Sequence, residues 1–268
     1  MHRIVVIAEI GENHRGDMGI ARELIAASAE AGADYAKLQL YDASRTAPDD
    51  PERDWFFRVQ LTGDKFAELA VYARSVGIRP LCTPWDVSAA RVIFSLGIRE
   101  MKIASFHIVD LGLLRFVNER ATTVFLSTGM SSLEEIKAAV DCLPDVQNLY
   151  LLHCVSEYPL PVENVNLRMI DTLQRMFGHR AGIGYSDHTT GILAPVAAVA
   201  RGAKVIEKHL TLDKSFEGTD HILSATPLEL KTMIEQIRLV EAMLGTGEKV
   251  LTPAELANQA FLRERFHH

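Results

Sequence analysis

The sequence GIGYSDH at residues 182–188 is followed by Thr-Thr-Gly and then by a run of small apolar residues, ILAPVAAVAR. This order predicts a short strand that ends in Ser-Asp-His and leads into a helix. A second apolar stretch ending in histidine, residues 204–209, follows directly. Strands joined through a helix run parallel, so their carboxyl ends lie at one edge of a sheet. His188 and His209 are therefore expected to lie close together.

The same alternation of strand and helix runs through the rest of the chain. Short apolar, often β-branched runs are separated by longer segments with glycine or proline at their ends. Strands are predicted at residues 4–10, 34–40, 79–83, 100–105, 122–128, 149–154, 182–188 and 204–209. Helices are predicted at about 18–31, 63–76, 86–97, 110–119, 131 onward, 166–177, 192–201 and 227–244, and a polar loop at 42–62.

Several residues are expected to begin or end these helices. Asp17 and Asp86 precede predicted helices and are candidate N-caps. Ser131 with Glu134 has the spacing of a capping box, and Gly32 is placed to end the first helix.

Eight such strand–helix units predict an α/β fold, a (β/α)8 TIM barrel, over residues 1–245. An open doubly wound sheet is the alternative, but no G-x-G-x-x-G turn follows the first strand. The polar residues 246–268 are expected to form a C-terminal tail or short helix.

Bulk properties narrow the class of protein. The 268 residues carry a formal charge of −7, which does not favour a nucleic-acid partner. Three cysteines without paired spacing favour a reducing compartment and buried, structural thiols. The N-terminus leads directly into a strand, and no apolar run is long enough for a bilayer, so a cytoplasmic location without membrane contact is expected.

Polar residues gather at the predicted strand ends, where barrels of this kind carry out chemistry. Lys37 and Lys102 lie within apolar strands, and a buried ammonium needs an anion. Glu9 or Glu207 would satisfy them as structural ion pairs; a phosphate or carboxylate ligand is the other possibility. Small hydroxyl donors follow other strands, at Ser105, Ser127, Ser156 and Ser186.

The two strand-end histidines allow two interpretations. A single histidine in such a place is most often structural, and His153, inside an apolar strand, is interpreted in that way. Two on neighbouring strands favour a shared metal ion, because imidazole is a common ligand. With only His188 and His209 as ligands, positions stay open for water or substrate, which suits a catalytic divalent ion.

Eight motifs along the chain now carry a resemblance. AEIGENHRGD, AKLQ, LCTPWD, KIASF, LSTGM, HCVSEYPLP, GYSDHTTG and EKHLTLD occur in this order over residues 3–245. Together they resemble the sialic acid synthase family, which includes pseudaminic and legionaminic acid synthases and related spore-coat enzymes.

The resemblance implies a reaction and a set of ligands. Phosphoenolpyruvate would condense with the open-chain aldehyde of an N-acyl hexosamine to give a nonulosonic acid and phosphate. A divalent metal, typically manganese with magnesium or cobalt as alternatives, would bind His188 and His209, and the family implies a homodimer. The implied catalytic residues are Glu9, Lys37, Lys102, His107 and Asp220. The implied substrate-binding residues are Gln39, Ser105, Ser127, Ser156, Tyr158 and Ser186.

Two departures from the family pattern bear on this expectation. Where the family has a glutamate after the KIAS motif, this chain has His107, which is a candidate acid or base near neutral pH. The chain also ends where relatives continue into an antifreeze-like domain that supplies an arginine to a partner's pocket. These departures leave two other hypotheses, a barrel lyase or aldolase acting on a different small aldehyde, and a non-catalytic ligand-binding barrel.

Overall fold

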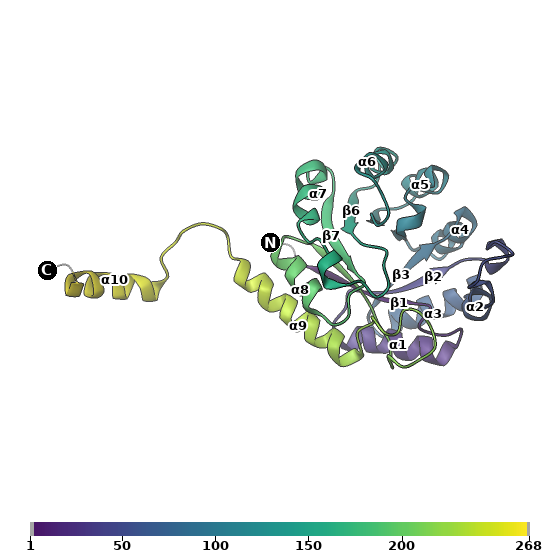
Figure 1. The fold of residues 1–268 in the computed structure, drawn as a ribbon, viewed down its shortest axis with the longest axis horizontal. Coiled ribbons are helices and arrows are strands. Elements are labelled where there is room, and N and C mark those ends of the chain that lie inside the picture. Colours follow the sequence, from purple (N-terminus) through teal and green to yellow (C-terminus); the bar gives the residue numbers. More distant parts are fainter. Residues whose placement is uncertain (1–2, 267–268) are drawn as a thin grey trace.

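Eight parallel strands form a nearly closed barrel in the computed structural model, which describes residues 3–266 (Figure 1). Their hydrogen-bonded order is β3-β2-β1-β8-β7-β6-β5-β4, and β3 packs against β4 to close the cylinder. The strands are β1 (Val5–Gly11), β2 (Tyr35–Leu40), β3 (Arg79–Pro84), β4 (Glu100–Ile103), β5 (Thr123–Ser127), β6 (Asn148–His153), β7 (Gly182–Asp187) and β8 (Val205–His209). The predicted (β/α)8 barrel is confirmed.

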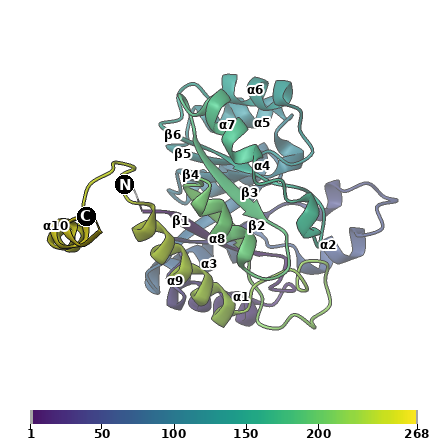
Figure 2. The ribbon, with the colours of Figure 1, turned by 60° about the vertical axis from the view of Figure 1, so that its left-hand side comes forward.

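Helices cover the outside of the barrel (Figures 1 and 2). They are α1 (Met18–Glu30), α2 (Arg53–Val59), α3 (Gly63–Ser75), α4 (Val87–Ser95), α5 (Leu111–Asn118), α6 (Leu133–Asp141), α7 (Met169–Phe177), α8 (Leu193–Ala200) and α9 (Pro227–Leu244). A further helix, α10 (Pro253–Phe266), does not cover the barrel (Figure 1). Within residues 3–266, no helix is both long and apolar enough to cross a membrane.

The predicted helix caps are confirmed at two positions and wrong at a third. The Asp17 carboxylate accepts hydrogen bonds from two backbone amides of α1, and Asp86 accepts one from α4. The capping box of α6 is formed by Ser132 with Glu135, not by Ser131 with Glu134. Ser131 instead donates its hydroxyl hydrogen to the carbonyl of Gly129, so the turn extends one residue further before the helix begins.

The polar loop predicted at 42–62 is wrong in part, because it contains α2 and the short 3-10 helix Ala43–Arg45. Within α2, Phe56 packs edge-on against Tyr41 and Trp85, and Val59 is buried. The abundance of proline and charge around this segment concealed a helix that packs through few apolar residues.

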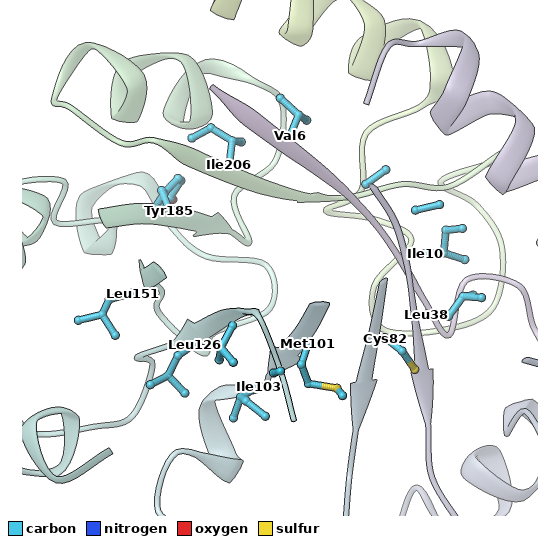
Figure 3. Packing of buried hydrophobic residues seen from close by; sticks show 14 of the residues in the cluster. Val6, Ile10, Leu38, Cys82, Met101, Ile103, Leu126, Leu151, Tyr185 and Ile206 are labelled. Carbon is cyan, nitrogen blue, oxygen red and sulfur yellow. The ribbon is translucent and has the colours of Figure 1, made fainter. Parts of the chain in front are cut away.

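Side chains along each strand alternate between the inside and the outside of the barrel. Figure 3 shows the outward set, such as Val6, Leu38 and Ile206, packed in the layer between the strands and the helices. A separate apolar cluster fills the inside of the barrel and consists of Ile7, Tyr35, Leu81, Phe125, Leu152 and Val205. The inward residues that follow this cluster along the strands are polar. The interior of the barrel is therefore apolar toward the amino ends of the strands and polar at their carboxyl ends.

The C-terminal segment lies apart from the barrel in both views (Figures 1 and 2). No residue of α10 is buried. The division into a synthase domain at 1–245 and a tail at 246–268 stays a prediction, and its outer ends, residues 1–2 and 267–268, lie outside the described residues.

An ion pair is buried on the outward face of β7 and β8. The Lys208 ammonium lies 2.6 Å from Oδ2 of Asp187, and both side chains are fully buried. Lys208 also donates to the carbonyl of Thr189, and Asp187 accepts from Tyr185 and Thr189. Both residues lie at strand ends, and the alternation of side chains turns both away from the barrel interior.

We expect Lys208→Met to lower the free energy of unfolding by about 3 kcal/mol, because it leaves a buried carboxylate without its cation. Lys137→Met is the matched control, since Lys137 forms an exposed pair with Asp141 in α6 and should lose less than about 0.5 kcal/mol. Urea unfolding at pH 7 measures both. A loss for Lys208→Met no larger than that of the control would contradict the importance of the buried pair.

Candidate active site

A cavity of about 480 Å³ opens at the carboxyl ends of the strands. Nearly all of the side chains singled out in the sequence line it. They are Glu9, Lys37, Gln39, Lys102, Ser105, Ser127, Ser156, Tyr158, Ser186, His188, His209 and Asp220. Eight strands of a closed barrel thus bring together residues that are up to about 200 positions apart in the sequence.

A buried lysine bridges two glutamates on the floor of this cavity. Nζ of Lys37 lies 3.1 Å from Oε2 of Glu9 and 2.8 Å from Oε2 of Glu207. Burial alone would lower the pKa of Lys37, but the two carboxylates outweigh it and raise that pKa. Of the two roles considered for this lysine, the ion pair with glutamate is therefore present.

Lys102 is less fully paired than Lys37. Its ammonium donates to the carbonyl of Ile103 at 3.1 Å and lies 3.7 Å from Oε1 of Glu207. An ammonium has three N–H donors, so donors stay available for a bound anion. Burial lowers the pKa of Lys102 to about 8, which makes the group sensitive to mildly alkaline pH.

Hydroxyl groups complete this side of the cavity. The Ser105 hydroxyl accepts a hydrogen bond from the backbone N–H of Gly129 at 3.1 Å. A Cβ on Gly129 would lie 2.5 Å from Oγ of Ser156 and 2.8 Å from Oγ of Ser105, so only glycine lets both serines approach. Oγ of Ser127 is buried without a hydrogen-bond partner. A buried unpaired hydroxyl beside a lysine fits an anionic ligand.

The two strand-end histidines also meet at this cavity, with their ring centroids 5.5 Å apart. Nδ1 of His188 lies 2.6 Å from the carbonyl of Val155, which only accepts, so Nδ1 carries the proton and Nε2 has a lone pair to offer; the Cys154 sulfur lies 4.0 Å from this Nε2. Nδ1 of His209 lies 3.2 Å from Oδ2 of Asp220, which likewise leaves its Nε2 free. Metal-bound histidines commonly have their second nitrogen held in this way.

These donors fit a metal ion with open positions. Two imidazole rings that share one ion through bonds of about 2.1 Å have centroids on the order of 5 Å apart, close to the observed separation. Within residues 3–266, no group of three or more histidine, cysteine, aspartate or glutamate side chains is arranged around one point. A metal ion bound there would have two imidazole ligands, and its other positions would be taken by water or substrate.

Aromatic residues border the two histidines and the glutamates. The Tyr158 ring lies 3.9 Å from the His188 ring, measured between centroids. Gln39 donates to Oε1 of Glu9 at 3.0 Å and accepts from the indole N–H of Trp85 at 3.1 Å. This chain of hydrogen bonds fixes the orientation of the Glu9 carboxylate.

The structure gives different outcomes for three residues about which the sequence raised an expectation, His107, Cys154 and His153. His107 does not line the cavity; its ring packs 4.2 Å from that of Phe106, whose side chain lines the wall instead. Cys154 was expected in the core but lines the cavity, which corrects that expectation. His153 is structural as predicted, because its Nε2 lies 2.8 Å from the Val165 carbonyl, away from the cavity.

Sequence reasoning missed two carboxylates in the cavity wall, Glu52 and the more buried Glu12. The oxygens of Glu12 accept hydrogen bonds from the Tyr41 hydroxyl at 2.7 Å and from the Trp55 indole N–H at 2.6 Å. Burial raises its pKa to about 7, although the two hydrogen bonds act in the opposite direction. The signal that could have found it is a glutamate among glycine and asparagine directly after β1, at an active end of the barrel.

Glu12 should make stability depend on pH. Its pKa is near 4.5 when unfolded and about 7 when folded, so the folded state holds the proton between these values. Stability therefore falls as pH rises from about 4.5 to 7. Gln at this position cannot ionise. We therefore expect the free energy of unfolding of Glu12→Gln, relative to that of the unchanged protein, to be higher at pH 8 than at pH 5 by on the order of 2 kcal/mol. Urea unfolding at both pH values measures this; an unchanged difference would refute the raised pKa.

Comparison with known proteins agrees with this geometry. Residues 24–249 match the NeuB family. N,N'-diacetyllegionaminic acid synthase from Campylobacter jejuni is 37% identical over 98% of this chain and 84% of its own length. Human N-acetylneuraminate-9-phosphate synthase is 36% identical over 96% and 75%. The crystal structure of an N-acetylneuraminic acid synthetase from Leptospira borgpetersenii superposes with a TM-score of 0.93 at 32% identity, over 100% of this chain and 93% of that one. The chain therefore belongs to the NeuB family.

Proposed function

We propose that this protein condenses phosphoenolpyruvate with the open-chain aldehyde of an N-acyl hexosamine, giving a nonulosonic acid and phosphate. Its relatives in the NeuB family are named as sialic, legionaminic and pseudaminic acid synthases. The observation that carries the proposal is a buried lysine–serine floor beside two free imidazole nitrogens in one cavity. The relatives reported above are named as synthases, which supports this reaction over a lyase or a non-catalytic role.

Phosphoenolpyruvate would bind at the floor. Lys102 has N–H donors to spare, and Ser105 and Ser127 supply hydroxyls to phosphate or carboxylate oxygens. Ser186 donates to Glu207 at 2.8 Å and thereby holds that glutamate between the two lysines. The floor thus combines cations for the ligand with carboxylates that keep the lysines in place without it.

The sugar aldehyde would lie above the floor, beside the imidazoles. His188 and His209 would hold a divalent metal through their Nε2 atoms, with manganese as the first expectation and magnesium or cobalt as alternatives. When bound, such an ion polarises an aldehyde carbonyl as a Lewis acid. Asp220 fixes the His209 ring, and Tyr158 packs on the His188 ring, so both ligands are held before substrate arrives.

The condensation joins carbon three of phosphoenolpyruvate to the aldehyde carbon, whose oxygen takes a proton and becomes a hydroxyl. Water adds at carbon two, and phosphate then leaves. One aldehyde, one phosphoenolpyruvate and one water thus give one nonulosonic acid and one phosphate. Glu9 is a buried carboxylate in the cavity wall, paired with the Lys37 ammonium through Oε2, and it is our candidate to receive the proton of that water. We assign His107 no step, since it does not line the cavity. The homodimer and the cytoplasmic location stay predictions.

Removing either imidazole should abolish the metal-dependent reaction. We expect His188→Ala and His209→Ala to lower phosphate release from phosphoenolpyruvate at least about 100-fold and to weaken manganese binding measured by electron paramagnetic resonance. His179→Ala, an exposed histidine of another surface, is the control and should keep activity within about twofold. Full activity in both site variants would exclude the assignment of the ligands.

Lys102 should set the alkaline limit for phosphoenolpyruvate. Its pKa of about 8 means that it loses its charge above that pH, so kcat/KM for phosphoenolpyruvate should fall about tenfold per pH unit beyond it. Lys102→Arg, which stays charged, should move this limit to higher pH, and Lys102→Ala should raise KM for phosphoenolpyruvate steeply. A pH profile that is the same in all three proteins would rule out an anion contact by Lys102.

A further inference from the structure

The balance of charge in the cavity differs between its floor, where two lysines face two glutamates, and its rim, where carboxylates have no cation beside them among the described lining residues. The floor is buried and carries the two lysines with their glutamates. The rim consists of the more accessible lining residues, and its ionised or ionisable groups are carboxylates: Glu12 after β1, Glu52 before α2 and Asp220 after β8. Aromatic rings, among them Phe56 and Tyr158, fill the space between them.

Within residues 3–266, no lysine or arginine lines this rim. The arginines on the same segments contact aromatic rings instead. Arg15 lies over the Phe216 ring at 5.1 Å, Arg53 over that of Phe57 at 5.1 Å, and Arg58 over that of Trp55 at 4.5 Å, as measured to the ring centroids. Arg58 also pairs with Glu217. A negatively charged substituent reaching the rim would therefore meet carboxylates and no cation.

Glu12 is held firmly enough to act in recognition. Tyr41 and Trp55 each donate one hydrogen bond to a different carboxylate oxygen. Each of these oxygens keeps a second lone pair for a further donor. Deeper in the same cavity, Thr83 Oγ1 and Ser127 Oγ are buried without partners, which indicates that the cavity is shaped for a polar occupant rather than closed by its own side chains.

We propose that the acceptor is an uncharged N-acyl aldose, not a sugar phosphate, and that Glu12 and Glu52 select it by accepting hydrogen bonds from its hydroxyl groups and repelling a phosphate. This inference rests on the proposed condensation and specifies its second substrate. It matters because relatives are named both for a free sugar acid and for a 9-phosphate product. The reaction that supplies the acceptor must then deliver it without phosphate.

The test offers each member of a panel of N-acyl hexosamines in its free and its 6-phosphorylated form, with phosphoenolpyruvate and manganese at pH 8, where Glu12 is mostly ionised. Phosphate release from phosphoenolpyruvate is followed by consumption of the enol absorbance. We expect kcat/KM for the best free sugar to exceed that for its phosphate at least about tenfold, because like charges at a partly buried site repel.

Charge reversal at the rim should shift this preference. Glu52 is exposed, so Glu52→Lys should fold. We expect this variant to lower the ratio of kcat/KM for the free sugar to kcat/KM for the phosphorylated sugar at least about fivefold, through a lower KM for the phosphorylated sugar. Glu163→Lys makes the same change of net charge at an exposed site outside the cavity and should leave the ratio within about twofold. Glu12→Gln should raise KM for the free sugar about tenfold and leave KM for phosphoenolpyruvate unchanged.

Each result decides between the two levels of the proposal. Equal or better turnover of the phosphorylated sugar, with phosphoenolpyruvate consumed, would overturn the inference while the condensation stands. An equal response of the ratio to Glu52→Lys and Glu163→Lys would overturn the role of the rim. If phosphoenolpyruvate is not consumed with any sugar of the panel, free or phosphorylated, the proposed function is overturned, and the inference with it.

Discussion

The buried contact of Lys37 with Glu9 and Glu207 is the interaction on which the site depends. It joins β2 to β1 and β8 across the barrel interior, where all three side chains are buried and an isolated charge would be costly. Lys102 approaches the same Glu207 from β4, so four strands share one network of charge. Because the glutamates neutralise the lysines in the absence of ligand, the barrel can fold with two buried lysines, and Lys102 still has donors left for an anion.

Alternation along the strands explains why so much of this could be predicted. An apolar run interrupted by Lys37 and Gln39, two residues apart, places both on one face, whichever way the strand is turned. The closed barrel then requires that face to be the interior, since helices cover the other. Residues such as Ser186, His188 and His209 could be assigned to one cavity because their distance from a strand end fixes their height in the barrel.

The parts that could not be predicted depend on segments without a repeating pattern. Glu12 acquires its place only because Tyr41 and Trp55, from two other segments, hold its carboxylate. His107 was expected in the cavity from its place after β4, but a short 3-10 turn, Ser105–His107, presents Phe106 there instead. A shift of one residue in such a turn decides whether a titratable or an apolar side chain lines the cavity. No periodic pattern in the sequence predicts this shift.

The separation of the two imidazoles is set by contacts on both faces of one strand pair. On the inner face, Ser186 of β7 is paired in register with Glu207 of β8 and donates to it. On the outer face, the next pair in register, Asp187 with Lys208, forms the fully buried ion pair. His188 and His209 follow at once, so the strands cannot slip without breaking both contacts. The outer pair, which does not line the cavity, thus helps to fix the register of the two strands and with it the positions of the two imidazole rings.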